Sequence, residues 1–437
     1  MLQFLIILVS VCLYFLVKTI SDPLSRNILR MTILLWATIL LISSFNPYDL
    51  KPVSIDVYLI MLLYVSSFVL GALLVNAPRR SNSFSCINST RFDIDILKVA
   101  QDKKFLLLYI VCLLGALYLF KKQQLIIVSY NLGYLREDFY NLMFSGEPLL
   151  AALYNYILAP FFYVLIVIET YLILYNRKWR LIILFFPFII LYGSIAGGRI
   201  RFMAVIIVAL FMLLLHSNLA IDKKVFKKTI KVSVLLAVIF AFVISVMSMF
   251  RAGETEMSSE SLLVGLNKFT EQIVVYSVGS LRAFDIALQN DYVGQLGGFQ
   301  FGSATFCGIG KFLEPFFRHL FGIQMELSYD NIIANFLQTE VVDIGRNHYE
   351  EFNFAYTSAL IHYLDLGCVG VFLIQLFFGY FSRSIFIYLQ RNLNVPTVVI
   401  GSVIFYTIIY SVFTFFLING YGVEVLILMF IWNKFFK

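Results

Sequence analysis

The sequence predicts an all-α polytopic membrane protein with about eleven transmembrane helices and a large, partly helical extracytoplasmic loop. Of its 437 residues, 60% are apolar and 14% are charged, and the mean hydropathy is +0.87. Soluble domains are roughly half apolar and a quarter charged, so a soluble fold could not cover this much apolar surface. Apolar runs close to the ~20 residues that cross a bilayer recur along the whole chain, which makes lipid the solvent for most of it.

The apolar runs can be placed along the chain, with loops of alternating side between them. We expect spans near residues 2–20, 31–45, 54–75, 105–120, 149–175, 181–196, 202–216, 232–250, 355–382, 397–413 and 417–433.

The basic residues predict the orientation of these spans. If the N-terminus lies outside, the segments that face the cytoplasm hold most of the 33 Lys and Arg residues, as the positive-inside rule requires. We therefore expect an outer N-terminus, a cytoplasmic C-terminus and a single integral membrane domain, 1–437. Its outer parts are an interfacial segment, 121–147, and a large loop, 251–354. Because the basic residues form short clusters between apolar runs, the net charge of +7 indicates topology and not nucleic-acid binding.

A small-residue break separates two of the spans and is followed by Arg199 and Arg201. Gly193 and Gly197 can form a tight turn in which helices pack closely. Alternatively, two helix ends and two guanidinium groups form an anion site at the outer interface, since Arg binds phosphate oxygens bidentately.

Three further arginines lie on the predicted outer side. Arg136 stands in an aromatic-rich stretch, 130–140, that suits a helix lying on the membrane. Arg251 and Arg282 lie near predicted membrane boundaries, where an arginine needs an acidic partner or an anionic ligand. Acids such as Asp285 stand close in the sequence, so salt bridges are the alternative to ligand binding for all three.

Two groups of residues suit proton transfer. His348, followed by Glu350, is a candidate general base in the large loop, and Asp285 is a rival base. The alternative for His348 is an ordinary surface histidine. His362 and Asp365 lie three apart on one face of a predicted span, where they are either functional or a buried structural pair.

Two other acidic features bear on the class of protein. Glu169 and Glu424 fall inside predicted spans, which keeps a proton-coupled transporter among the alternatives. Asp93 and Asp95 form the Asp-x-Asp pattern with which many glycosyltransferases hold a metal-bound nucleotide sugar. They lie in a short inward loop without alternating strands and helices, so we expect no metal site there.

The chain resembles a known family in its topology and in a few segments. It has many helices, one large late outer loop and Arg199 after a small-residue turn; its segments 297–306 and 353–370 also match, the latter ending Asp365-Leu366-Gly367-Cys368-Val369-Gly370. In these features it is similar to the Wzy family of O-antigen and oligosaccharide repeat-unit polymerases. The topological likeness covers most of the chain, and the recognisable sequence covers a few dozen residues.

The resemblance implies a glycosyltransferase of the bacterial cytoplasmic (inner) membrane that uses no cofactor. Its donor would be a glycan on undecaprenyl pyrophosphate and its acceptor a lipid-linked repeat unit, with a chain-length regulator and a flippase as partners. Arginines would then stabilise the pyrophosphate leaving group, and a base would deprotonate the acceptor hydroxyl. The residues assigned to pyrophosphate are Arg199, Arg201, Arg251, Arg282 and Arg136, and the base is one of His348, Glu350 and Asp285.

Two alternatives stay open at this point. An O-antigen ligase shares the donor chemistry and the large outer loop. A lipid-linked oligosaccharide flippase or a proton-coupled transporter would need charges along a central cavity and often has repeated halves. The sequence has no internal repeat, and its polar residues concentrate on the outer side, which favours the enzyme.

Overall fold

The chain forms two compact units that are mostly helical. The structure is a computed structural model that describes residues 2–76, 96–129, 139–176, 178–195, 199–217, 259–321, 342–345, 351–352, 356–418 and 420–435. Unit 1 comprises Met1–Ser81, Ala241–Ile387 and Thr407–Gly420, and unit 2 comprises Asn82–Phe240, Tyr388–Tyr406 and Tyr421–Lys437.

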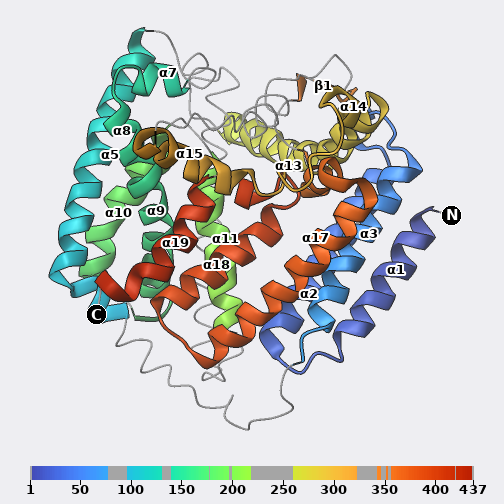
Figure 1. Ribbon diagram of the computed structural model, residues 1–437, viewed down its shortest axis with the longest axis horizontal. Helices are drawn as coiled ribbons and strands as arrows, with labels where there is room; N and C mark the ends of the chain where they lie inside the picture. The colour runs from blue at the N-terminus through green and yellow to red at the C-terminus, as the bar shows by residue number, and fades with distance from the viewer. Residues whose placement is uncertain are drawn as a thin grey trace. The chain divides into compact units, whose positions relative to one another are not determined.

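Unit 1 is built from long helices and one small sheet. Its elements are α1 (Leu2–Val17), α2 (Pro23–Ser44), η1 (Pro47–Asp49), α3 (Ile55–Leu73), α13 (Ser259–Gln289), α14 (Tyr292–Gln295), α15 (Cys307–Phe321), β1 (Val342–Asp343), β2 (Glu351–Phe352), most of α17 (Ser358–Arg391) and η6 (Phe416–Ile418). The strands β1 and β2 pair antiparallel, with Val342 opposite Phe352. In Figure 1, α2, α3 and α17 run alongside one another, and α13 (yellow) lies at one end of them.

Unit 2 contains the helices from the middle of the chain and from its C-terminal end. Its elements are α5 (Lys103–Ser129), α7 (Phe139–Phe144), α8 (Pro148–Leu153), η3 (Tyr154–Leu158), α9 (Ala159–Tyr171), η4 (Leu172–Asn176), α10 (Trp179–Ser194), α11 (Arg199–Ser217), most of α18 (Val395–Tyr410) and α19 (Gly420–Phe435). Helix α9 is buried on all sides, as expected of a helix that is apolar all round.

The predicted spans coincide with helices wherever the structure describes them. The span predicted at 232–250 lies outside the described residues. Three boundaries differ most from the prediction: the start of α2 and the ends of α5 and α17, the last of which continues past Arg383 to Arg391. Helix α2 begins at Pro23, because Asp22 accepts the Ser25 N–H at 3.0 Å as the N-cap and Pro23 suits the first turn. Helix α5 continues to Ser129 past Lys122, whose ammonium forms an ion pair with Glu147.

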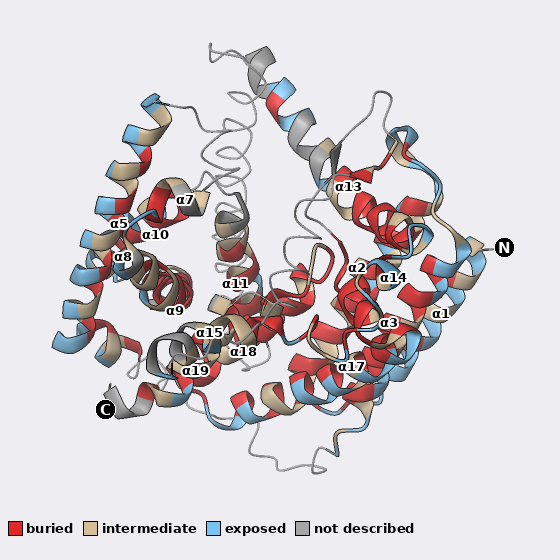
Figure 2. Cartoon of the chain, turned by 45° about the horizontal axis from the view of Figure 1, so that its top comes forward, coloured by how far each residue is buried: buried red, intermediate tan, exposed pale blue. Residues whose placement is uncertain are grey.

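The lengths of the helices are consistent with an all-α membrane protein. Within the described part of the chain, five helical stretches are long and apolar enough to cross a bilayer: Pro23–Ser44, Ile55–Leu73, Lys103–Ser129, Leu149–Leu174 and Ser358–Arg391. Shorter apolar helices cover the other described spans, so the count of about eleven stays a prediction. Figure 2 shows exposed residues along one side of α1, α5 and α17, where lipid would contact the helices.

Glycines let α3 and α17 pack closely against each other. A Cβ at Gly71 of α3 would collide with the carbonyl oxygen of Leu376, and a Cβ at Gly379 of α17 would collide with the carbonyl oxygen of Phe68. Small residues that bring backbones together are a common basis of helix association in lipid, where apolar side chains gain little by meeting one another.

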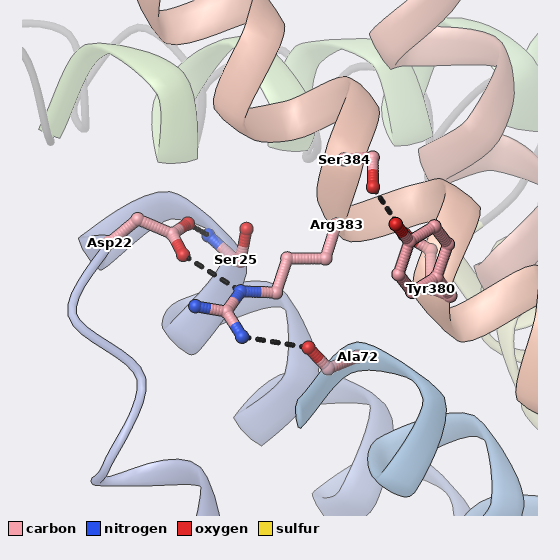
Figure 3. A network of polar contacts seen from close by, with 6 residues as sticks. All are labelled: Asp22, Ser25, Ala72, Tyr380, Arg383 and Ser384. Carbon is pink, nitrogen blue, oxygen red and sulfur yellow. Dashed lines mark hydrogen bonds and ion pairs between the residues drawn. The ribbon is translucent and has the colours of Figure 1, made fainter. Parts of the chain in front are cut away.

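A buried ion pair joins three helices at one end of unit 1 (Figure 3). The Arg383 Nε of α17 donates to the Asp22 Oδ2 at 3.1 Å, and the Arg383 Nη1 donates to the Ala72 carbonyl oxygen at 2.7 Å. The two charged side chains are only 6% and 2% exposed. The guanidinium thus satisfies both the N-cap of α2 and the carbonyl end of α3, in a place where water is scarce.

The contacts of unit 1 agree with the predicted alternation of sides. Asp22, Ala72 and Arg383, all at predicted cytoplasmic ends, lie together. Lys51 follows a predicted outer end, and its ammonium lies 2.8 Å from a carboxylate oxygen of Asp343, in the large loop that is predicted to be outside. These contacts fix which segments share a side; the assignment of one side to the cytoplasm rests on the basic residues.

We expect reporter fusions to place the large loop opposite the C-terminus. Alkaline phosphatase fused after residue 300 should be active, because that enzyme matures only outside the cytoplasm, whereas the same fusion after Lys437 should be inactive. Green fluorescent protein at the two sites should give the reverse pattern. Active phosphatase at the C-terminus would overturn the predicted orientation.

We expect Arg383→Met to destabilise the protein strongly, because it leaves the Asp22 carboxylate buried without its partner. The free energy of unfolding should fall by about 3 kcal/mol, measured by denaturation in detergent micelles. The matched control is Arg391→Met in the last turn of α17, where the side chain is exposed, and it should leave stability near the wild-type value. Equal stability of the two variants would refute the assigned role of the ion pair.

Candidate anion-binding site

The structure describes the side chains of three of the eight predicted site residues: Arg201, Arg282 and Asp285. Arg199 is the first residue of α11, and its side chain is not among those described. The others lie outside the described residues: Arg136, Arg251, His348 and Glu350. The structure brings Arg282 and Asp285 together, one turn apart on α13 of unit 1.

Arg282 is a buried cation with unused donors. Its side chain belongs to a residue that is 1% exposed, and its Nη2 donates to the Asn46 Oδ1 at 2.8 Å. Asn46, which follows the C-cap of α2 and precedes η1, has a left-handed backbone with φ 46°, a conformation that asparagine tolerates better than most residues. The Nε and Nη1 atoms of Arg282 have no hydrogen-bond partner. A guanidinium has five N–H groups in a fixed fork, so this one can still bind an acceptor.

Asp285 fastens α13 to the start of α3. Its Oδ2 accepts the backbone N–H of Ser54 at 3.0 Å and the Gln289 Nε2 at 3.2 Å. Ser54 is the N-cap of α3, where a nearby carboxylate is favourable because the helix dipole is positive. The carboxylate therefore positions the element that carries Arg282.

The charge of Arg282 lacks a carboxylate in direct contact. Burial lowers the pKa of its guanidinium to about 10, and the negative charge of Asp285 partly opposes that shift. The group is still protonated at neutral pH. Within the part of the chain that the structure describes, no carboxylate forms an ion pair with Arg282. A buried charge of this kind is costly unless an anion or water meets it, so the arrangement suits an anionic ligand.

A second polar cluster, which we call the Asp365 clamp, holds the glycine-rich loop 296–306 on α17. The Asp365 Oδ1 accepts the backbone N–H groups of Gly302 and Ala304 at 2.8 and 3.0 Å, and its Oδ2 accepts that of Thr305 at 3.0 Å. Gly302 has φ 95°, which a residue with a Cβ rarely adopts, so the turn that aims these N–H groups requires glycine there.

A break in α17 explains why the loop attaches at this point. Leu366 and Gly367 have non-helical backbone angles, and Gly367 has φ 61°. The carbonyl groups of Leu364 and Asp365, just before the break, accept the loop N–H groups of Gln300 and Phe301. The loop thus satisfies backbone groups that an unbroken helix would have paired internally.

His362 extends the Asp365 clamp into the helices. Its Nδ1 lies 2.9 Å from the Thr305 Oγ1 and its Nε2 lies 2.9 Å from the Gln375 Nε2. Because the Gln375 amide nitrogen is a donor, the His362 Nε2 accepts and its Nδ1 donates to Thr305. The Tyr64 ring stacks on the imidazole at 6.2 Å between centroids. His362 and Asp365 are therefore bridged through Thr305, and both are fully buried.

The Asp365 clamp and Arg282 belong to the same end of unit 1. Phe284 of α13 and Tyr363 of α17 pack edge to face with their ring centroids 5.9 Å apart. These residues stand two positions from Arg282 and from Asp365, respectively. This ring contact holds α13 against α17 at that end of unit 1.

The guanidinium of Arg201 forms hydrogen bonds to neighbouring residues of unit 2. Its Nη1 donates to the carbonyl oxygens of Tyr192 and Ile195 at 2.9 and 2.7 Å, and its Nη2 donates to the Tyr154 hydroxyl. The guanidinium also lies over the Tyr192 ring, 4.6 Å from its centroid. These contacts close the carbonyl end of α10, as expected of the tight-turn alternative.

A small cavity beside His362 is no substrate site. It measures about 10 Å³ and is bordered by Trp36, Tyr64, Gln375 and Ser411, among others. That volume is close to one water molecule, whereas pockets for drug-sized ligands are larger by more than tenfold.

No protein-family model, curated protein or solved structure matches the chain. The likeness to repeat-unit polymerases therefore stays an expectation, and the site has to be interpreted from its own chemistry.

Sequence reasoning missed the partners that decide what these residues do. An asparagine before a proline, as at Asn46 and Pro47, is typical of a turn. No feature of the sequence, however, linked Asn46 to Arg282, 236 positions away. Thr305 and Gln375 carried no signal of their own. The glycines of loop 296–306 were a signal that could have indicated unusual backbone angles, since Gly297, Gly298 and Gly302 have positive φ.

We expect Asp365→Asn to loosen the loop. The asparagine side chain has one acceptor oxygen where the carboxylate has two, and its own N–H groups would point at backbone N–H groups of the loop. The free energy of unfolding should fall by about 2 kcal/mol. Hydrogen exchange of residues 300–306, read by mass spectrometry in detergent, should accelerate. Asp49→Asn is the matched control, since Asp49 is exposed and has a left-handed backbone that asparagine accepts. Unchanged exchange in Asp365→Asn would contradict the clamp.

Proposed function

We propose that this protein polymerises undecaprenyl-pyrophosphate-linked oligosaccharide repeat units into O-antigen or a related surface polysaccharide on the outer face of the cytoplasmic membrane. The observation that carries the proposal is Arg282, a buried guanidinium with two nitrogen atoms that lack a hydrogen-bond partner. It stands on a segment predicted to be outside the cytoplasm, at the level where the phosphates of a lipid-linked sugar emerge.

The chemistry is a transfer of a glycosyl group from one lipid carrier to another sugar. An acceptor hydroxyl of the lipid-linked repeat unit attacks the anomeric carbon of the growing glycan. A new glycosidic bond forms, the bond to the pyrophosphate oxygen breaks, and undecaprenyl pyrophosphate leaves with the electron pair. Arg282 would stabilise the negative charge on that leaving group in a site with little competing water.

The remaining predicted roles belong to the same proposal. Arg199, Arg251 and Arg136 are proposed as further groups for the pyrophosphate. The proton of the acceptor hydroxyl goes to one of His348, Glu350 and Asp285. Asp285 already accepts two hydrogen bonds that position α13, which supports a structural contribution as well.

One observation favours a second candidate, a flippase or proton-coupled transporter. Glu169 of α9 and Glu424 of α19 are buried in unit 2, and the Oε2 atom of each lacks a hydrogen-bond partner. Unpaired acids within spans often mark proton pathways. The lipid-linked glycans of a strain lacking the protein would separate the possibilities. Polymerase loss leaves single repeats on the outer leaflet, ligase loss leaves lipid-linked polymer, and flippase loss leaves single repeats on the inner leaflet.

We expect Arg282→Met to abolish long polymer while sparing the fold. Removing one charged donor from a developing anion costs roughly 100-fold in rate, so polysaccharide gels should show single repeats in place of ladders. Thermal stability should equal or exceed that of the wild type, because the substitution removes a buried charge that lacks an ion-pair partner.

Two comparisons make this experiment decisive. Arg383→Met should lose stability, whereas Arg282→Met should not. Inorganic pyrophosphate should raise the unfolding temperature of the wild-type protein and leave that of Arg282→Met unchanged. Wild-type ladders from Arg282→Met at normal expression would defeat the proposal, and so would a loss of ladders accompanied by a loss of stability.

A further inference from the structure

Helix α15 turns its apolar side outward. Phe306, just before the helix, and Ile309, Leu313 and Phe321 within it follow helical spacing and are all exposed, Phe306 at 57% and Phe321 at 65%. At 100° per residue Phe306, Ile309 and Leu313 fall on one face, and Phe321 lies at the edge of that face. The stripe covers about 22 Å along the helix axis, at 1.5 Å per residue.

The opposite side of α15 faces the protein and carries polar residues. Cys307 is buried there, and its Sγ donates to the Ile418 carbonyl oxygen at 3.2 Å. Lys311 lies on the Cys307 side and Glu314 lies at the boundary between the two sides, and both are only partly exposed. In water this orientation would be inverted, because a surface helix buries its apolar stripe and exposes its charges. The outward face of α15 therefore calls for an apolar medium.

The Asp365 clamp places the start of α15 at the boundary of the hydrocarbon. From Gly367 to Arg383, α17 rises about 24 Å, most of the ~30 Å hydrocarbon thickness. Arg383 marks one end of that stretch, and the loop held by Asp365 marks the other. Helix α15 follows the loop directly and, with 15 residues, is too short to cross a bilayer.

The apolar face of α15 continues the lipid-facing side of α17. That side has exposed residues at helical spacing, including Val369, Leu373, Phe377 and Phe381. Phe299 connects the two, since its partly exposed ring lies against Gly367 at the top of α17. Phe301, 78% exposed, donates its backbone N–H to the Asp365 carbonyl oxygen. The outward surface is thus apolar from α17 through the loop to α15.

We propose that α15 is an interfacial helix that lies in the outer leaflet, with Phe306, Ile309, Leu313 and Phe321 inserted at the boundary of headgroups and acyl chains. Phospholipid is the occupant of this face. A helix of this kind buries its apolar side about 5–10 Å into the boundary region and keeps its polar side toward the protein and the headgroups. The inference requires the outer position of the loop but does not depend on the proposed polymerase activity.

Quenching by brominated lipids tests the depth of the helix. The full chain carrying Leu313→Trp is reconstituted into phosphatidylcholine vesicles, with bromine placed shallow or deep in the acyl chains. The emission of the parent protein, with its three tryptophans, is subtracted. The added tryptophan should lose most of its emission to the shallow label and less to the deep one. Lys311→Trp, on the other side of the helix, should be quenched by neither.

Phe306→Trp gives an independent reading if Leu313→Trp does not fold as a single species on size exclusion. A Leu313→Trp emission typical of indole in water, with no quenching, would overturn the proposal by placing the face in solvent. A blue-shifted but unquenched emission would overturn it as well, because protein, such as a second copy of the chain, would then cover the face.

Discussion

The Asp365 carboxylate is the interaction on which the outer end of unit 1 depends. It accepts three backbone N–H groups of one loop, and it does so where α17 breaks and exposes its own carbonyl groups. Lipid supplies no hydrogen bonds, so both sets of backbone groups must find partners within the protein. The Asp365 carboxylate therefore has two structural effects. It fixes where the loop attaches, and through the loop it fixes where α15 begins.

The contrast between Arg383 and Arg282 shows how the same side chain serves structure or function. Arg383 is paired with Asp22 and with the Ala72 carbonyl oxygen, so its burial is compensated within the protein. Arg282 is buried to a similar degree but has one hydrogen bond, to a neutral amide. A protein that needed only stability at this position would gain by placing methionine or leucine there. This uncompensated charge is the observation on which the proposed binding of an anion rests.

The sequence predicted the helices better than the contacts at the outer end of unit 1, for one physical reason. Spans follow from local composition, because each ~20-residue run must satisfy its own backbone in lipid. The site depends on pairs far apart in the chain, such as Arg282 with Asn46 and Thr305 with His362, which periodicity does not report. The boundaries of α2 and α5 were missed where charged residues continued the helix, since Asp22 and Lys122 found partners that the local pattern could not show.

The outer end of unit 1 combines two features that few ligands satisfy together. A soluble anion would find a partner in Arg282 but would gain nothing from an outward apolar helix. The substrate that we propose, an amphiphile with its phosphates at headgroup depth and a long apolar tail, would use both features, because Phe284 of α13 packs on Tyr363 of α17 and Asp365 of the same helix holds the loop before α15. A proton-coupled transporter would instead depend on acids within the spans, such as Glu169 and Glu424, and Arg282 would then have no part in transport.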